Sequence, residues 1–274
     1  MSNHLPECTE MPAGVLEVLP DSVRECVTVP DARSMDEAAF TEATLAAHRE
    51  IRSRLSARGV SRIVRMWNFI PGIHDTMADR RDRYMAFNAG RYRGMIEWFG
   101  GAEALLTNAP AASGVGWSGD DLIIHALATH EPGAAVQNPK QIPSVLYSKR
   151  FGPMPPSFAR ATRAGPVLLI SGTAAICGEE SVHANDLDRQ WELSLHNLRS
   201  LIASSGMPHG VDPLTAMRHV RVYLPSSTDA KRVSSAAKMA FTRARSLELV
   251  RADLCRLELL VEIEGIAVER DDYV

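Results

Sequence analysis

The order of predicted helices and strands repeats once along the chain, and this repeat limits the fold more than any other feature of the sequence. The first half has a helix over 35–58, a strand over 61–70, a helix over 79–99 and a strand near 121–129. The second half has a strand over 166–176, a helix over 185–204, a strand over 218–224, a helix over 228–245 and a strand over 259–268. Corresponding elements lie roughly 150 residues apart, the length of one ordinary domain.

This repeat predicts an α/β protein made of two halves, residues 1–150 and 151–274. Helices that connect strands of one sheet cover one of its faces. We therefore expect each half to be a mixed sheet backed by two helices. The proline-rich stretch 133–156 is the expected passage between the halves. The halves share no visible residue identity, so the repeat is one of pattern only.

Local signals set the limits of these elements. Ser34 and Glu37 are spaced as a capping box for the first helix, and Gly59 stands where a C-terminal glycine is expected. The segment 61–70 alternates apolar and polar residues, which predicts a strand. Residues 114–119 fit G-x-G-x-x-G, but a strand-like segment follows them where a dinucleotide site needs a helix. A glycine-rich turn is the expectation there.

Composition and charge exclude several classes of partner. Of 274 residues, 45% are hydrophobic and 23% charged, and the formal net charge is −3. The basic residues Arg80, Arg81 and Arg83 are flanked by acidic ones, so nucleic acid is not the expected partner. The opening residues lack the pattern of a signal peptide, and the longest apolar stretch, 167–177, is too short to span a bilayer. We expect no membrane contact.

The cysteines and histidines carry no metal-binding pattern. The four cysteines are scattered without a C-x-x-C pair, and the nine histidines show no spacing suited to a metal. This usage is typical of a reduced protein of the cytoplasm that has no structural zinc. A cytoplasmic protein without a metal site is therefore the expectation.

The strand predicted over 259–268 carries two acidic side chains, Glu262 and Glu264. Residues two apart on a strand point to the same face, so these carboxyl groups emerge side by side among Leu, Val and Ile. Burial and like-charge repulsion both raise a carboxyl pKa, and a proton held near neutral pH is what a general acid needs. An exposed sheet face with two solvated glutamates explains the same pattern equally well.

Cys255 and Arg256 lie just upstream of this acidic pair. Arginine can bind a carboxylate through two parallel hydrogen bonds, so Arg256 suggests an acidic substrate. A salt bridge from Arg256 to Asp253 or Glu258 is an alternative explanation. Cys255 fits a small buried hydrophobic side chain, the usual environment of an isolated cysteine. The pattern predicts an enzyme that binds a small anionic substrate, with the two glutamates in its active site.

Short motifs from about residue 60 to the last strand match one family in order. They are Arg65-Met-Trp-Asn68 with Gly72, Tyr84-x-x-Phe87 with Gly90-Arg91, Ala112-Ser-Gly-Val-Gly116, Asn138-Pro139, Tyr147, Gly152-Pro153-x-Pro-Pro156-Ser-Phe-Ala-Arg160-Ala161, Ser171-Gly-Thr-Ala174, His183, Asp186, Gln190, Glu192, Asn197, Val222-Tyr223 and Asp253-x-Cys-Arg256-x-x-Leu-Leu-Val-Glu-Ile-Glu264. Together these segments resemble the chorismatases, and the last strand also resembles that of the RidA/YjgF-like proteins.

The resemblance implies two RidA/YjgF-like (chorismate mutase-like) α+β halves fused in one chain. It also implies cleavage of chorismate into pyruvate and a benzoate or dihydrobenzoate, with no cofactor. By position, Glu262 matches the family's catalytic acid and Glu264 supports it. Arg160 matches an arginine of the substrate pocket, and Tyr147 a pocket tyrosine. Protonation of the enolpyruvyl methylene would make the ether oxygen a better leaving group while arginines hold the two carboxylates.

Gly172 and Cys255 bear on the identity of the product. Family members that only hydrolyse the ether carry alanine at both positions. The glycine–cysteine combination resembles members that form 3-hydroxybenzoate, or a mixture of 3- and 4-hydroxybenzoate, with Cys255 lying against the ring. The resemblance therefore favours a hydroxybenzoate product and leaves the isomer open.

The chain departs from the family pattern in two respects. Its N-terminal half is several tens of residues shorter, and Phe151 stands where a pocket tyrosine is common. A shortened half can expose a sheet edge that pairs with a second subunit, so a homo-oligomer stays open. Three alternative functions also stay open. They are a chorismate hydrolase that gives a dihydroxycyclohexadienoate, a RidA-like enamine/imine deaminase and a non-catalytic binder.

Overall fold

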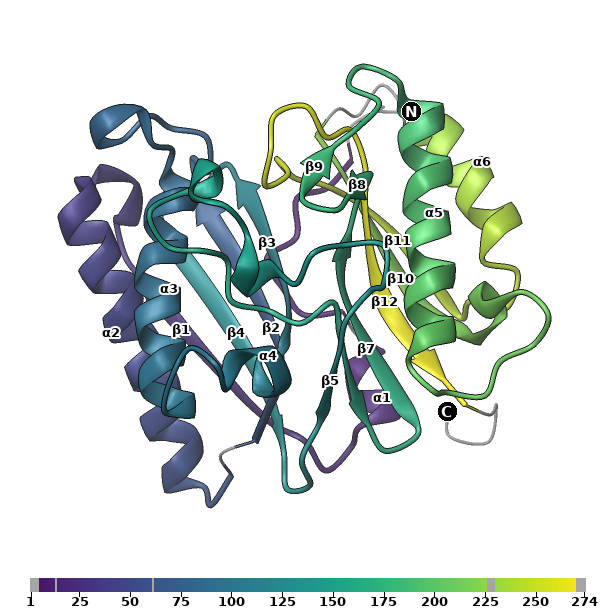
Figure 1. The fold of residues 1–274 in the computed structure, drawn as a ribbon, viewed down its shortest axis with the longest axis horizontal. Coiled ribbons are helices and arrows are strands. Elements are labelled where there is room, and N and C mark those ends of the chain that lie inside the picture. The colour runs from purple at the N-terminus through teal and green to yellow at the C-terminus, as the bar shows by residue number, and fades with distance from the viewer. Residues whose placement is uncertain (1–4, 13, 61, 226–229, 270–274) are drawn as a thin grey trace.

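The computed structural model describes residues 5–12, 14–60, 62–225 and 230–269, and its strands form two main sheets (Figure 1). The first sheet contains β1 (Val23–Val29), β2 (Arg62–Pro71), β3 (Ala111–Trp117) and β4 (Leu122–Thr129). The second contains β5 (Ala134–Val136), β6 (Ala161–Ala164), β7 (Val167–Thr173), β10 (Met217–Leu224), β11 (Ser246–Arg251) and β12 (Glu262–Val268). A separate hairpin pairs β8 (Ile176–Cys177) with β9 (Glu180–Ser181). The helices are α1 (Val15–Val18), α2 (Glu37–Ala57), α3 (Arg83–Phe99), α4 (Leu105–Asn108), α5 (Leu187–Ser204) and α6 (Ala230–Ala240).

The two sheets share one topology. The first has the strand order β1-β4-β2-β3, and the second contains the corresponding order β7-β12-β10-β11, extended by β6 and β5. In both, the first two pairings are antiparallel and the last, across a crossover helix, is parallel. A register shift also falls at the same place, between Ile63 and Arg65 in β2 and between Met217 and His219 in β10. The repeat predicted from the sequence is therefore a repeat of structure.

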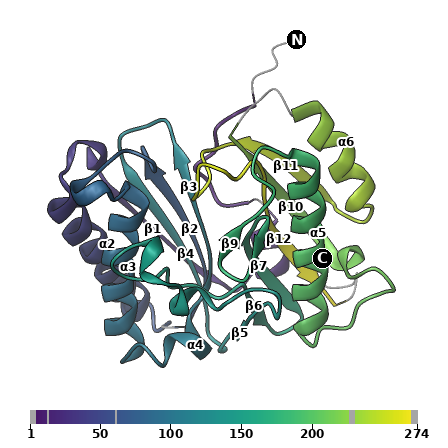
Figure 2. The same ribbon diagram turned by 45° about the horizontal axis from the view of Figure 1, so that its top comes forward.

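Helices lie on the outside of the molecule and the sheets face each other inside. Figures 1 and 2 show α2 and α3 covering the outer face of the first sheet and α5 and α6 that of the second. Each helix–sheet layer has its own apolar core. A third core lies between the sheets and contains Trp67 and Phe69 of β2 with Tyr223 of β10 and Ile266 of β12. Apolar burial on both faces of each sheet thus holds the halves together.

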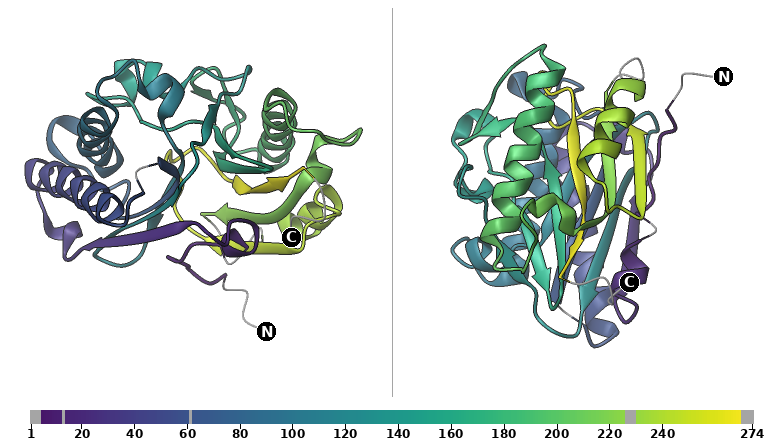
Figure 3. Two further views of the ribbon diagram at one scale, coloured as in Figure 1. Left: turned by 90° about the horizontal axis from the view of Figure 1, so that it is seen from below. Right: turned by 90° about the vertical axis from the view of Figure 1, so that its right-hand side faces the viewer.

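A segment before β1 covers one side of the inter-sheet core. We call residues 5–12 and 14–22 the N-terminal strap; Figure 3 shows it passing under the two sheets. Its Val15 and Val18 are buried in the inter-sheet core. The Thr9 carbonyl lies 2.8 Å from His125 Nε2 of β4, and the Glu10 carbonyl accepts a hydrogen bond of 2.7 Å from Arg221 of β10. The strap therefore binds strands of both halves.

The first helix is capped by a residue other than the two predicted. Asp36 is the N-cap of α2, and its carboxylate accepts a hydrogen bond of 2.8 Å from the Ala39 amide. The capping box of Ser34 and Glu37 is wrong, because the Ser34 hydroxyl bonds to the Asp31 carbonyl and Glu37 pairs with Arg81. Asp, like Ser, is a preferred N-cap, and the helix starts two residues later than expected. Gly59 has the positive φ of +73° expected of a C-terminal glycine.

Three features of the strands also differ from expectation. Strand β2 does not alternate, since all of its residues from Ile63 to Pro71 are buried between the helices and the other sheet; residue 61, where the predicted strand began, lies outside the described residues. The predicted turn at 114–119 is wrong up to Trp117, because this segment belongs to β3. Gly116 is needed there, since a Cβ would lie 2.6 Å from Ile73. The helix expected over 228–245 ends at Ala240, and the unpredicted strand β11 follows; residues 228 and 229 are outside the described part.

The predicted fold class is confirmed: the protein is α/β, with two halves that each have a mixed sheet and two covering helices. The boundary at residue 150 stays a prediction. Strand β5, which precedes it, pairs with β6 of the second sheet. The passage over 133–156 is mostly extended or in short turns, as expected from its prolines.

Candidate active site

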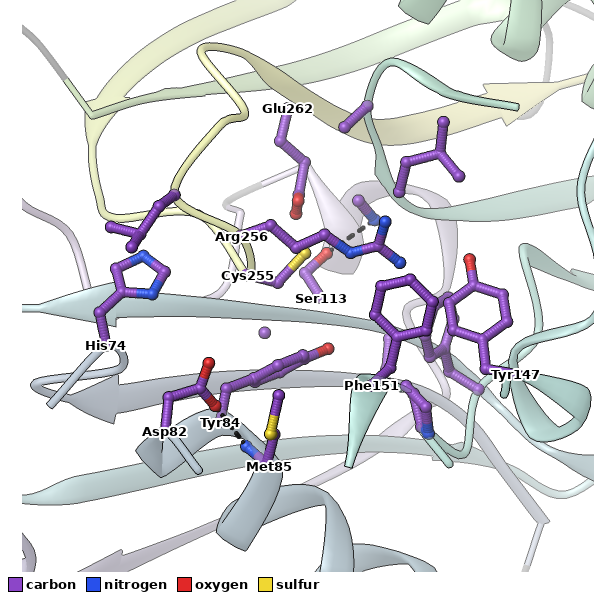
Figure 4. A pocket seen from close by; sticks show the side chains of 18 of the residues that line it. His74, Asp82, Tyr84, Met85, Ser113, Tyr147, Phe151, Cys255, Arg256 and Glu262 are labelled. Atoms are coloured by element: carbon purple, nitrogen blue, oxygen red, sulfur yellow. Dashed lines mark hydrogen bonds between the residues drawn. The ribbon is translucent and has the colours of Figure 1, made fainter. Parts of the chain in front are cut away.

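A cavity of about 270 Å³ lies between the two halves, and both contribute to its walls (Figure 4). Its lining includes every predicted site residue except Glu264. The lining residues used below are His74, Asp82, Tyr84, Arg91, Ser113, Tyr147, Arg150, Phe151, Phe158, Arg160, Gly172, Cys255, Arg256, Leu257, Glu258 and Glu262.

Glu262 points its carboxyl group into this cavity from the start of β12 (Figure 4). The residue is only 4% exposed. Burial, reinforced by the negative charge of Glu264, raises the pKa of Glu262 to about 8, although the cations of Arg65 and Arg160 oppose the shift. A carboxyl group with this pKa keeps its proton at neutral pH and can donate it to a bound molecule.

Glu264 lies on the same side of β12 but is held by protein groups on all sides. It is 1% exposed, and Arg65 approaches it at 2.7 Å. The Trp67 indole donates to it at 3.1 Å and the Tyr223 hydroxyl at 3.0 Å, and the Ser113 hydroxyl forms a further hydrogen bond. A carboxylate has about four acceptor positions, so Glu264 has none left for a substrate. The alternative of two solvated glutamates on an exposed face is wrong.

The topological repeat explains why the acidic pair occurs in one half only. When the register shifts of β2 and β10 are matched, Glu264 corresponds to His125 of β4 and Glu262 corresponds to Ile123. The first half therefore lacks a carboxyl group at either position. Its contribution is the opposite wall of the cavity, through β3 and the start of α3.

Gly172 and Ser113 fix the surroundings of Glu262. The Gly172 amide donates a hydrogen bond of 2.9 Å to the Ser113 hydroxyl, which links β7 to β3. A Cβ atom at Gly172 would lie 1.9 Å from Oε1 of Glu262. Any side chain at position 172 would thus require the Glu262 carboxyl group to move. Ser113 was not predicted as a site residue, although it lies within one of the quoted motifs.

Two buried arginines face the cavity without a carboxylate partner among the described residues. Arg160 donates hydrogen bonds to the Tyr147 hydroxyl at 2.5 Å and to the Ile142 carbonyl at 3.1 Å. Arg91 donates to the Asn88 side chain at 2.7 Å. Both guanidinium groups also lie over the Phe158 ring. Uncompensated buried cations favour an anionic ligand. Arg160 was predicted; Arg91 was not, and only its place beside Gly90 in a family motif pointed to it.

Arg256 lines the cavity and is partly exposed. Its guanidinium group is 4.0 Å from the centre of the Phe151 ring and 5.6 Å from that of Tyr147. Its Nη1 donates to the Glu179 carbonyl at 2.8 Å and to the Ser181 hydroxyl at 2.9 Å. Neither of the alternative salt bridges, to Asp253 or to Glu258, is formed among the described residues.

Cys255 lies in the cavity wall close to Glu262 (Figure 4). Burial and the negative charge of Glu262 raise the pKa of the Cys255 thiol to about 12. The side chain is therefore a neutral thiol at physiological pH. Since the thiolate is the nucleophilic form, this cysteine can shape the cavity but is not an activated nucleophile.

Comparison with known proteins identifies the family. A 3-hydroxybenzoate synthase of Streptomyces hygroscopicus is 36% identical over 242 residues, which cover 84% of this chain and 70% of that protein. A protein named chorismatase from the same organism is 31% identical, covering 85% of this chain and 70% of its own length. The chain belongs to the chorismatase family. The profile described as "Chorismatase FkbO/Hyg5-like, N-terminal" matches residues 23–128, which run from the start of β1 to one residue before the end of β4.

The fold of this chorismatase also agrees with a solved structure of the family. The crystal structure of a chorismatase superposes with a TM-score of 0.78 at 28% identity, covering 90% of this chain and 75% of that one. Within the described residues, no group of three or more His, Cys, Asp or Glu side chains is arranged to hold a metal ion. None of the described helices is long and apolar enough to cross a membrane.

Proposed function

We propose that this chorismatase cleaves chorismate into pyruvate and a hydroxybenzoate, with Glu262 as the general acid. One observation carries the proposal: a carboxyl group that keeps its proton at neutral pH faces a cavity with buried arginines that have no carboxylate partner in the described part of the chain. Chorismate is a dianion with an acid-labile enol ether. Proton transfer from Glu262 to the enolpyruvyl methylene makes the attached carbon electrophilic and weakens the ether bond.

The other cavity residues hold the substrate in this proposal. Arg160 and Arg91 bind the carboxylates, assisted by the Arg256 nitrogens that form no hydrogen bond to the described residues. Tyr147 and Phe151 pack against the apolar parts of the substrate. Glu264 does not touch the substrate. It acts only on Glu262, through its negative charge, which helps Glu262 to retain a proton.

A hydroxybenzoate is the product that Gly172 and Cys255 favour. Gly172 leaves room for Glu262 in its observed position, and Cys255 is a neutral, polarisable side chain that can lie against the ring. A relative named 3-hydroxybenzoate synthase supports the 3-isomer, with 4-hydroxybenzoate as the other isomer. The runner-up is hydrolysis to a dihydroxycyclohexadienoate, since other relatives are named only chorismatase.

The direct test is to incubate the purified protein with chorismate, measure pyruvate and separate the aromatic products by chromatography. Pyruvate with 3- or 4-hydroxybenzoate is the expected result. Pyruvate with the dihydrodiol would leave the acid chemistry in place and overturn the proposed product. If no pyruvate formed, the proposal would fail, and an enamine/imine substrate would be tested next.

The rate of pyruvate release should fall as the pH rises through about 8. Glu262 acts in its protonated form, and its pKa of about 8 means that this form is present below that pH and lost above it. Glu264→Gln removes a charge that raises the pKa of Glu262, so the fall should move to lower pH. Initial rates across the neutral and alkaline range test both statements. A fall that stays at the same pH in the variant would contradict the role given to Glu264.

A further inference from the structure

Two segments that follow the first sheet in the chain line one side of the cavity. One is the turn region 144–151, which carries Tyr147 and Phe151, and the other is the β8–β9 hairpin. The Ser148 amide donates a hydrogen bond of 2.8 Å to the Glu179 carboxylate, and Arg150 forms an exposed ion pair with Glu180. The two segments are thus joined to each other near the solvent.

Arg256 joins a third segment to this wall. It follows Cys255 in the loop before β12, and through one nitrogen it holds the hairpin at the Glu179 carbonyl and the Ser181 hydroxyl. The same guanidinium group covers the Phe151 ring at 4.0 Å. Arg150 lies over that ring as well, at 4.7 Å. In Figure 4 the Arg256 side chain extends toward Phe151.

The two candidate products differ in their need for water. In hydrolysis, water adds to the electrophilic enolpyruvyl carbon and loses a proton. The bond from that carbon to the ether oxygen then breaks, which gives pyruvate and the dihydrodiol. A hydroxybenzoate and pyruvate together contain only the atoms of chorismate. There the bond between the ring carbon and the ether oxygen breaks, and pyruvate keeps that oxygen. The neighbouring hydroxyl oxygen stays on its own carbon in 4-hydroxybenzoate, and moves through an epoxide to the carbon that carried the ether in 3-hydroxybenzoate. In both cases the ring loses one proton, which balances the one donated by Glu262. Exclusion of water therefore favours the hydroxybenzoate.

We propose that Arg256 is a positioning residue that closes the cavity against water by holding Phe151 and the β8–β9 hairpin together, and thereby directs the reaction toward the hydroxybenzoate. The inference rests on the proposed function and adds to it. It also gives a reason for the bonds of Arg256. A residue that only bound a substrate carboxylate would not need to donate hydrogen bonds from Nη1 to the hairpin.

Ser181 separates this role from direct substrate binding. Its hydroxyl accepts a hydrogen bond from Arg256, but the residue is not part of the cavity lining. Ser181→Ala therefore weakens the anchoring of Arg256 without removing any group that can reach the substrate. The matched control is Ser235→Ala on α6. Its exposed hydroxyl donates to the Lys231 carbonyl of the same helix and to no other group of the described residues.

The experiment measures the ratio of dihydrodiol to hydroxybenzoate, together with kcat and KM, for the unaltered enzyme and these variants. Arg256→Met should raise the ratio roughly tenfold, the effect of losing a hydrogen bond made by a charged group. Ser181→Ala should change it in the same direction but less, and Ser235→Ala should leave it unchanged. If Arg256→Met does not fold, the product ratio of Ser181→Ala still tests the role proposed for Arg256.

An increase in KM for Arg256→Met with an unchanged product ratio in both variants would overturn the inference, because Arg256 would then only bind substrate. Dihydrodiol as the main product of the unaltered enzyme would also overturn it, since the cavity would not exclude water. Absence of pyruvate from the unaltered enzyme would instead mean that the proposed function itself is wrong.

Discussion

Glu262→Gln is expected to reduce pyruvate release from chorismate by about 10²- to 10⁴-fold, the usual contribution of a general acid. Glutamine has nearly the same shape but no acidic proton. Glu262 is itself uncharged at neutral pH, because its pKa is about 8, so the substitution leaves the local charge unchanged. Binding of chorismate should persist and can be measured by calorimetry on the same protein.

Glu258→Gln is the matched control for this prediction. Glu258 also borders the cavity, but its side chain is exposed to solvent. The same chemical change at this position should leave turnover close to that of the unaltered enzyme. Should Glu262→Gln retain full turnover, the acid would have to be another group. Asp82 would be tested next, because it lines the cavity and burial raises its pKa.

Arg65→Met is expected to lower the free energy of unfolding by about 3–5 kcal/mol. Arg65 is 2% exposed and provides the counter-charge of Glu264, which is itself buried. Removing the guanidinium group leaves a buried carboxylate without its cation and also breaks the bond from Arg65 to the Ser113 hydroxyl at 2.7 Å. Chemical denaturation of the variant and the unaltered protein measures the difference.

The double variant Arg65→Met/Glu264→Gln tests the cause of this loss. It removes the unpaired charge, so a substantial part of the stability should return. Arg93→Met is a matched control. Arg93 forms an exposed ion pair with Glu42, so its loss should leave the free energy of unfolding almost unchanged. A double variant as unstable as Arg65→Met would show that packing, and not charge, explains the effect.

The sequence predicted the acidic pair well but not its surroundings. The two-residue spacing of a strand correctly placed Glu262 and Glu264 on one side, because this geometry is local. Their different environments depend on contacts across the chain. Arg65 is 199 positions away from Glu264, and no local pattern pairs them. Arg91 was missed for the same reason, since its approach to the cavity depends on how α3 packs against β3.

The errors in the fold have local causes. The two glycines of β3 gave it the composition of a turn. Gly116 is nevertheless required within the strand, because Ile73 and Asp253 approach it closely. The start of strand β11 was missed and the preceding helix was predicted too long, because no glycine or proline lies between α6 and β11. Most helices and central strands were found, because their apolar pattern and terminal residues are continuous in sequence.

The N-terminal strap has a consequence for how the chain is made on the ribosome. The Glu10 carbonyl is bound by Arg221, 211 positions later. At about 5–20 residues per second, translation needs roughly 10–40 s to cover that distance. During this time strands β1–β4 and their helices can assemble. The inter-sheet core in which Val15 and Val18 are buried is still incomplete, because it also needs strands of the second sheet. Docking of the strap must therefore be a late step, which follows the emergence of β10 from the exit tunnel.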